Sequence, residues 1–354
     1  MIETNVSPME QVRCNLCGAD DTRLLFRRED RFNQKEGIFN VVRCRGCGLI
    51  YLNPRPARER MGYYYDVEGY EAYNKVGVEE IGIMNRQNGW FSHLKNEVKR
   101  LILQEHYGYF AQKTEFERWR WLKRLAVWPF LAKYRGMYFK TIPFLGEGKA
   151  LDVGCGSAGY LAWLKQLGWQ VYGVEIDAES VRYAKEEYGI DVFCGELQES
   201  FFTDSFFDAI TMWHFLEHAP DPLLVLSKCA QLLKTSGLLV IGVPHAGSLE
   251  AKVFLENSLL FDVPRHLYNF TPQTLGELLR KSGFVVERIA YAPRSINTIN
   301  AALNRVLEKK GLPYRVHSRW RKIIFAQWFD TLLRWLGLSS AFIVFAKKKS
   351  EGDC

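Results

Sequence analysis

The sequence predicts an α/β fold in which a mainly parallel sheet is covered by helices on both faces. Two observations carry this prediction. From Lys149 onward, apolar runs alternate with amphipathic helical segments, and the runs lack the in-out alternation of a sheet with one wet face. A glycine-rich turn follows the first run, at the place where such sheets bind ligands, between a strand and a helix.

The expected elements alternate in order through the second half of the chain. We expect strands at 149–154, 170–176, 191–195, 207–214, 237–244 and 284–291, and a final edge strand at 341–349. We expect helices at 157–167, 178–188, 222–233 and 272–282. This pattern predicts a domain at 146–354 with a helical insertion at about 293–340.

Two C-x-x-C pairs, separated by 26 residues, lie near the start of the sequence: Cys14, Cys17, Cys44 and Cys47. The first residues are acidic and polar and lack the apolar core of a signal peptide. In a protein without a secretion signal, two C-x-x-C pairs, or knuckles, are typical of metal ligands rather than disulfides. Four thiolates close a tetrahedral site, so we expect a structural Zn²⁺ in a zinc-ribbon-like module at 1–60. A redox pair or a knuckle that has lost its metal is the alternative.

The net charge of +7 is concentrated in two aromatic-rich segments. Residues 90–140 hold eleven Lys/Arg against four Asp/Glu, and residues 305–336 hold eight against two. The first segment falls in a helical linker or lid region at 61–145. Lid helices over a pocket, helices resting on an anionic membrane, nucleic-acid binding and dimer contacts all fit this pattern. No apolar run is long enough to span a bilayer. Without a targeting signal we expect a cytoplasmic protein, and the membrane alternative would add peripheral contact at the inner membrane face.

The glycine-rich turn, ALDVGCGSAG, places Gly154, Gly156 and Gly159 in a G-x-G-x-x-G frame. In a dinucleotide site, the pyrophosphate rests on the helix N-terminus, and the nearby carboxylate of Asp152 would repel it. S-adenosylmethionine carries an ammonium and a sulfonium instead of a phosphate. The charge of Asp152 therefore favours the methyl donor.

A second carboxylate, Glu175, stands at the end of the second expected strand, 23 residues after Asp152. Its two carboxylate oxygens can accept hydrogen bonds from both ribose hydroxyls of an adenosine, in a dinucleotide site or in an S-adenosylmethionine site. The alternative is that Glu175 caps the helix that begins near Ala178, although Asp177 suits that cap better.

The segments LDVGCGSAGYLAWLKQLGWQVYGVEID, FDAITMWHFLEHAPDP and LLVIGVPH resemble the successive motifs of class I S-adenosylmethionine-dependent methyltransferases, over about 145–290. The resemblance implies a Rossmann-like, seven-stranded, mostly parallel sheet. It also implies further donor contacts beside the glycines and Glu175: Ile176, Glu196, Leu197, Met212, Trp213 and His214. The cysteine module, followed by LNPRP and tyrosines, is similar to methyltransferases of bacterial polysaccharide and secondary-metabolite pathways.

Methyl transfer to an alcohol or a carbon acid needs a base, and histidines at strand ends are the candidates. His266 is flanked by Asp262 and Arg265, which we assign to the acceptor site, and an Asp could hold its imidazole in one tautomer. His266 as a loop anchor is the alternative. His218 directly follows Glu217. The pair could be a base and the carboxylate that orients it, it could bind a divalent metal, or it could cap the next helix. We also assign His245 to the acceptor site.

These observations predict a methyltransferase that acts on a small-molecule, sugar or lipid-linked glycan acceptor, most simply at a hydroxyl. RNA methylation is an alternative within enzymes. A zinc-containing binding protein whose methyltransferase domain has lost activity is the alternative outside them.

Overall fold

The computed structural model describes residues 9–65, 90–109, 125, 140–292 and 331–349. These residues fall into two compact units. The first contains the described residues of 1–70, 212–230 and 241–354, and the second those of 71–211 and 231–240. Most of the insertion at 293–340 and part of both basic segments lie outside the described residues.

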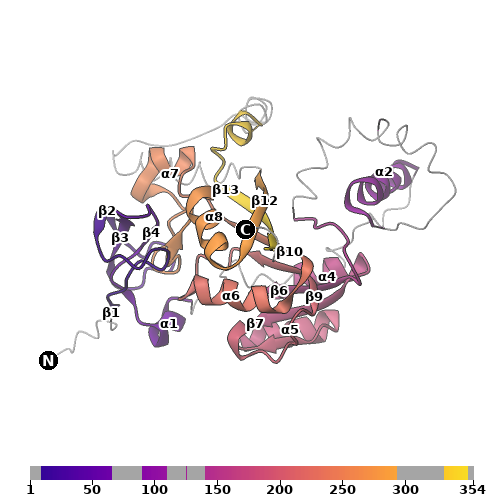
Figure 1. The fold of residues 1–354 in the computed structure, drawn as a ribbon, viewed down its shortest axis with the longest axis horizontal. Coiled ribbons are helices and arrows are strands. Elements are labelled where there is room, and N and C mark those ends of the chain that lie inside the picture. Colours follow the sequence, from indigo (N-terminus) through magenta and orange to yellow (C-terminus); the bar gives the residue numbers. More distant parts are fainter. Residues whose placement is uncertain (1–8, 66–89, 110–124, 126–139, 293–330, 350–354) are drawn as a thin grey trace. The chain divides into compact units, whose positions relative to one another are not determined.

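A seven-stranded sheet follows the order β12-β13-β10-β9-β6-β7-β8 (Figure 1). Strand β6 pairs in parallel with β7 and with β9, and β7 pairs in parallel with β8. The expectation of a mostly parallel α/β sheet is therefore confirmed. The strands are β6 (Lys149–Val153), β7 (Gln170–Glu175), β8 (Val192–Cys194), β9 (Phe207–Trp213), β10 (Leu233–Pro244), β12 (Phe284–Tyr291) and β13 (Ala341–Lys348).

The expectation that the last apolar run is an edge strand is wrong. Strand β13 lies between β12 and β10, and it pairs antiparallel with β12, which is the edge. The physical reason is burial. Residues 342–346 of β13 are all buried, whereas β12 alternates between buried, half-buried and exposed positions. An uninterrupted apolar run needs cover on both faces, which an interior strand receives.

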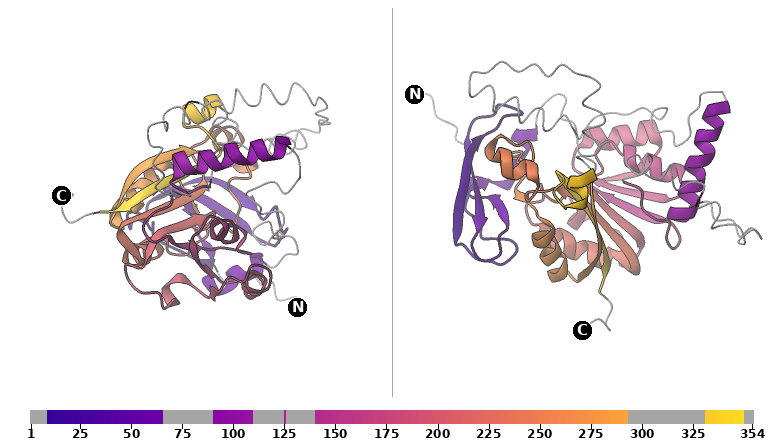
Figure 2. Two further views of the ribbon diagram at one scale, coloured as in Figure 1. Left: turned by 90° about the vertical axis from the view of Figure 1, so that its right-hand side faces the viewer. Right: turned by 90° about the horizontal axis from the view of Figure 1, so that it is seen from above.

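The helices that follow the strands match their predicted ranges to within two residues at each end. They are α4 (Gly159–Gln166), α5 (Ala178–Tyr188), α6 (Pro222–Leu232) and α8 (Pro272–Lys281). A further helix, α7 (Leu249–Phe254), was not predicted. Helices α4 and α5 pack on β7, and α8 packs on β12 and β13. Helix α2 (Trp90–Tyr107) is a single unbroken helix in Figure 2. Among the described residues, no helix has the length and apolarity to cross a membrane.

The N-terminal module is built on a four-stranded antiparallel sheet in the order β11-β4-β3-β2. Its strands are β2 (Thr22–Glu29), β3 (Ile38–Cys44), β4 (Ile50–Leu52) and β11 (Tyr268–Asn269). A second sheet pairs β1 (Met9–Glu10) with β5 (Arg55–Pro56), and helix α1 (Met61–Tyr65) closes the module. Strand β11 comes from far along the chain, immediately after Leu267, so the module shares its sheet with the segment that carries His266.

Candidate donor loop and histidine cluster

The glycine loop joins β6 to α4 in the backbone conformation that its sequence requires. Gly154 and Gly156 both have positive φ, at 71° and 53°. Glycine adopts this left-handed conformation without the steric cost that a side chain would add. The amide of Gly154 donates to the carbonyl of Val174 on β7 at 2.9 Å, which fixes the loop against the sheet. Gly159 is the first residue of α4.

The carboxylate of Asp152 is buried on β6 and accepts a hydrogen bond from the Thr211 hydroxyl of β9 at 2.6 Å. Burial raises the pKa of Asp152 to about 7, although the Thr211 hydrogen bond and the Lys140 charge oppose the rise. Such a carboxyl binds a cation favourably, because a nearby positive charge restores its ionised form. Thr211 was not anticipated, although a hydroxyl inside the apolar run FDAITMW was a visible signal.

The Glu175 side chain ties the ends of the first two strands together. One carboxylate oxygen accepts from the Gly156 amide at 2.8 Å, and the other accepts from the amides of Ile176 and Asp177 at 2.8 and 3.1 Å. The alternative that Glu175 caps α5 is wrong, because Asp177 is the N-cap and accepts from the Ser180 amide at 2.7 Å.

The remaining predicted donor contacts differ in their surroundings. Ile176 leaves 66% of its surface exposed directly after Glu175, so an apolar side chain is open to a ligand there. Glu196 caps a short 3-10 helix, and Leu197 within that helix is buried. Met212 is buried in β9, and Trp213 ends that strand.

His214 follows β9 in a backbone conformation that is uncommon for a residue with a side chain, with a φ of 55°. Its amide donates to the Gly242 carbonyl at 2.9 Å, and its Nδ1 lies 3.2 Å from Oε1 of Glu217. Glu217 is almost fully buried. Burial alone would raise its pKa, but the hydrogen bond from His214 and the histidine charges around it hold that pKa below its usual value.

His218 and His266 form the centre of a cluster, with ring centroids 4.8 Å apart. Nδ1 of His218 lies 3.0 Å from the Arg265 carbonyl, and Nδ1 of His266 lies 2.9 Å from the Leu260 carbonyl. A carbonyl only accepts, so the contact of His218 places the proton on its Nδ1 and leaves the lone pair on its Nε2. Nδ1 of His266 lies closer to the Leu260 carbonyl than to the Asp262 amide nitrogen, which is 3.4 Å away. Burial and the charge of His266 lower the pKa of His218 to about 4, which keeps its imidazole neutral.

Two of the alternatives for these histidines are resolved by the hydrogen bonds. The Leu260 carbonyl, rather than the Asp262 side chain, orients the His266 imidazole, so the expected Asp–His pair is wrong. The helix cap after His218 is Asp221, whose carboxylate accepts from the Leu224 amide at 3.1 Å, so the capping alternative for His218 and Glu217 is wrong as well.

Arg265 is fully buried and engaged with two carboxylates. Its Nε donates to Asp262 at 2.8 Å, and its terminal nitrogens donate to both oxygens of Asp30 at 2.9 and 3.1 Å. Asp30 belongs to the N-terminal module and was not anticipated, because the two partners are 235 residues apart. Arg265 and Asp262 therefore join the module to the loop that carries His266.

His245 makes contacts of its own at the end of β10. Its Nδ1 lies 3.0 Å from the Ser339 carbonyl, and its ring packs against Phe342 and Tyr291. Burial lowers the pKa of His245 to about 4, so the ring is neutral. These contacts anchor the start of β13 to β10.

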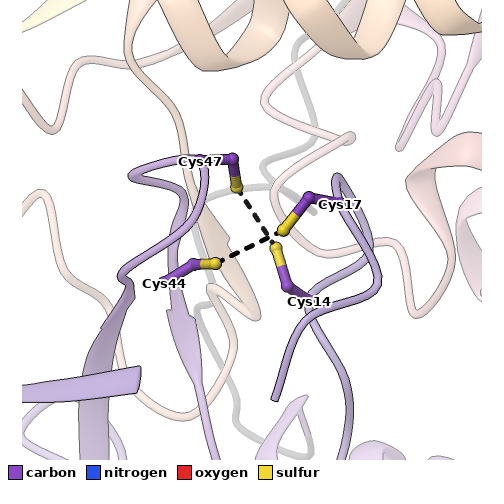
Figure 3. A group of neighbouring side chains, drawn as sticks. All are labelled: Cys14, Cys17, Cys44 and Cys47. Atoms are coloured by element: carbon purple, nitrogen blue, oxygen red, sulfur yellow. Dashed lines mark hydrogen bonds between the residues drawn. The ribbon is translucent and has the colours of Figure 1, made fainter. Parts of the chain in front are cut away.

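The four N-terminal cysteines converge, with all their sulfur atoms within 4.8 Å of one another (Figure 3). The sulfur atoms of Cys14 and Cys47, and those of Cys17 and Cys44, are 3.4 Å apart. Thiolates around a tetrahedral Zn²⁺, with bonds of about 2.3 Å, lie about 3.8 Å apart. The donor set and its spacing are compatible with a structural Zn²⁺.

The glycine after each second cysteine adopts a left-handed backbone conformation. Gly18 has a φ of 77° and Gly48 a φ of 80°. Each amide donates back to the carbonyl of the first cysteine of its pair, at 2.8 and 3.0 Å. Strand β3 ends at Cys44 and enters the second knuckle, and β2 follows the first knuckle.

Comparisons with known proteins find similar sequences. A family model described as a methyltransferase domain matches residues 120–289. A protein named ubiquinone biosynthesis O-methyltransferase from Methylococcus capsulatus is 29% identical over 175 residues, which cover 45% of this chain and 73% of that protein. A protein of the same name from Xanthomonas euvesicatoria is 29% identical over 165 residues, covering 43% of this chain and 69% of that protein.

Solved structures are also similar to this chain. A SAM dependent methyltransferase from Archaeoglobus fulgidus has 21% sequence identity and a TM-score of 0.41, and the match covers 62% of this chain and 94% of that one. A SAM dependent methyltransferase from Aquifex aeolicus has 17% identity and a TM-score of 0.39, with 59% and 87% covered.

Proposed function

We propose that the chain is an S-adenosylmethionine-dependent methyltransferase that moves the methyl group to a hydroxyl of a small-molecule acceptor. The donor loop and the histidine cluster have separate tasks in this proposal. Asp152, Glu175 and the glycine loop hold the donor, and His218 and His266 activate the acceptor. The naming of two curated relatives as O-methyltransferases supports oxygen as the acceptor atom.

The observation that carries the donor assignment is the buried Asp152 carboxylate beside a glycine loop with positive φ angles. This site favours a cation and disfavours the pyrophosphate of a dinucleotide. Glu175 is buried with three amide donors on its oxygens, and we assign it to the ribose hydroxyls of the donor. Ile176, Glu196 and Leu197 are assigned to the adenine end, and Met212, Trp213 and His214 to the methionine end.

The reaction is an in-line displacement at carbon. The acceptor hydroxyl loses its proton, its oxygen bonds to the methyl carbon, and the carbon–sulfur bond breaks, which leaves S-adenosylhomocysteine and a methyl ether. The sulfonium is already a good leaving group, so the protein's main tasks are alignment and help with the proton. His218 and His266 offer imidazole nitrogens, the kind of group needed near a hydroxyl that must ionise.

The N-terminal module has a structural task in this proposal. Cys14, Cys17, Cys44 and Cys47 would hold Zn²⁺, which closes the two knuckles and leaves no open coordination position. The module then presents Asp30 to Arg265 and Tyr65 to His218. In this way zinc stabilises the surroundings of the histidine cluster without taking part in the chemistry.

We propose a sugar or lipid-linked glycan hydroxyl as the acceptor, with peripheral contact to an anionic membrane through the basic aromatic segments. The resemblance of the cysteine module to polysaccharide-pathway methyltransferases supports this acceptor class. The charge surplus of 305–336, which mixes Arg and Lys with Trp and Phe, supports the membrane contact.

A screen with methyl-labelled donor tests the proposal. The full chain is incubated with nucleotide sugars, lipid-linked sugars, phenols and RNA, and the labelled product is identified. We expect label on a hydroxyl of a small or lipid-linked acceptor, and we expect His266→Asn to reduce turnover while donor affinity stays within twofold. Transfer of label to RNA alone, or an equal loss of donor binding in His266→Asn, would contradict the proposal.

A further inference from the structure

We propose that Glu217, His218 and His266 bind a divalent transition-metal cation, and that this cation takes the acceptor hydroxyl as an additional ligand. The cation site stands on the geometry of the cluster alone. Its use in methyl transfer rests on the proposed function.

The three side chains offer one ligand atom each, and these atoms all lie within 4.8 Å of one another. Two ligands on opposite sides of a cation with bonds of about 2.1 Å are about 4.2 Å apart, so small side-chain rotations close the set. The ligands come from two loops. Glu217 and His218 lie between β9 and α6, and His266 precedes β11.

The imidazoles are held as metal-binding histidines usually are. Their Nδ1 atoms lie at hydrogen-bond distance from the carbonyls of Arg265 and Leu260. These contacts fix the rings and leave each Nε2 as the nitrogen that can bind the cation. This second shell of backbone carbonyls is typical of histidine ligands.

The clearest sign of a missing partner is the carboxylate of Glu217. Its Oε1 lies at hydrogen-bond distance from His214, but among the described residues its Oε2 is buried and has no hydrogen-bond partner. A buried oxygen of a charged group that lacks a hydrogen-bond partner destabilises the folded state. A cation beside the two imidazoles would satisfy this oxygen.

His214 positions the carboxylate. Its backbone is held in the left-handed conformation while its ring contacts Oε1 of Glu217. Strained backbone of this kind concentrates at functional sites. The contact leaves Oε2 as the carboxylate oxygen that remains for the cation.

Two imidazole nitrogens and one carboxylate oxygen select the class of metal. Imidazole suits Zn²⁺, Fe²⁺, Co²⁺ and Ni²⁺, whereas Mg²⁺ and Ca²⁺ prefer oxygen ligands alone. Three protein ligands leave coordination positions open to a hydroxyl. A hydroxyl bound to the cation ionises more readily, its proton passes to solvent water, and the resulting oxygen attacks the methyl group. His218 and His266 thus act as ligands in the activation of the acceptor.

Cobalt binding tests the site without any turnover. The full chain, loaded with one Zn²⁺ at the cysteines, is titrated with Co²⁺ by calorimetry and absorption spectroscopy, in the absence of donor and acceptor. We expect one Co²⁺ per chain with visible bands of a nitrogen and oxygen site. We also expect no sulfur-to-cobalt charge-transfer band, which would report exchange at the cysteines. Glu217→Gln keeps the shape of the side chain and should weaken Co²⁺ binding at least tenfold, whereas His245→Gln, at a buried histidine outside the cluster, should not.

No Co²⁺ bound by the zinc-loaded chain, or equal Co²⁺ affinity in folded Glu217→Gln, would overturn the proposal. If Glu217→Gln fails to fold, His266→Asn replaces it in the same titration. Co²⁺ binding without transfer to any hydroxyl acceptor would contradict the proposed function and leave the cation site standing. Full hydroxyl methylation by a chain that binds no second metal would overturn the cation site and leave the proposed function standing.

Discussion

The hydroxyl of Tyr65 lies 2.8 Å from Nδ1 of His218, so the last residue of helix α1 contacts the histidine cluster. The same Nδ1 lies 3.0 Å from the Arg265 carbonyl. The N-terminal module therefore helps to orient the imidazole of His218, which lies 153 residues after Tyr65 in the chain.

Tyr65→Phe should weaken Co²⁺ binding at the histidine cluster about fivefold, because one hydrogen bond that orients His218 is lost. Donor affinity should stay unchanged. Calorimetry with each ligand measures both values on the same preparation. Tyr63→Phe, at an exposed tyrosine of the same helix, is the matched control. A fall in donor affinity equal to the fall in Co²⁺ affinity would indicate general damage instead.

Asp30→Asn should lower the free energy of unfolding by about 3 kcal/mol, because it leaves part of the buried Arg265 charge without its partner. Asp21→Asn removes the partner of Arg45 in an exposed pair and should cost less than about 0.5 kcal/mol. Urea denaturation measures both. Similar values for the two variants would show that the buried pair contributes little.

Affinity for S-adenosylmethionine should rise about tenfold between pH 6 and pH 8. Burial raises the pKa of Asp152 to about 7, so the carboxyl is mostly neutral below that pH and mostly ionised above it, and the ionised form attracts the donor's positive charges. Calorimetry across this pH range gives the slope. Asp152→Asn cannot ionise and should show weak, nearly pH-independent binding. An unchanged slope in that variant would assign the effect to another group.

Loss of the metal should unfold the N-terminal module before the donor loop. Cys44→Ser removes a ligand, so we expect a lower first melting transition and faster hydrogen exchange in β2 and β3. Donor affinity should stay within twofold, since the glycine loop belongs to the other compact unit. Cys229→Ser replaces a single cysteine in α6 and keeps the metal. Equal zinc content in Cys44→Ser and the unchanged chain would refute the assignment of the ligands.

Local sequence patterns were sufficient for most elements of the fold. The range of α5 is correct at both ends, because Asp177 caps its start and Gly189 follows its last residue in the left-handed conformation. The left-handed glycines Gly18 and Gly48 are features of the same kind, because each directly follows a C-x-x-C pair. Each of these features depends on a few neighbouring residues, which a sequence displays directly.

Contacts across the chain were not predictable in the same way. Composition marked β13 as a strand, but its interior place depends on which strands pair with it. The pairing of Asp30 with Arg265 and the contact of Tyr65 with His218 have no local signal, because each joins residues far apart in sequence. The sequence suggested Glu217 and His218 as a pair, whereas the approach of His266 required the folded loop.

The most direct test of the central claim is the choice of donor. Isothermal titration calorimetry of the full chain at pH 8 should show binding of S-adenosylmethionine, no binding of NAD, and at least a tenfold loss of donor affinity in Asp152→Ala. Binding of NAD without S-adenosylmethionine, or full donor affinity in Asp152→Ala, would contradict the account.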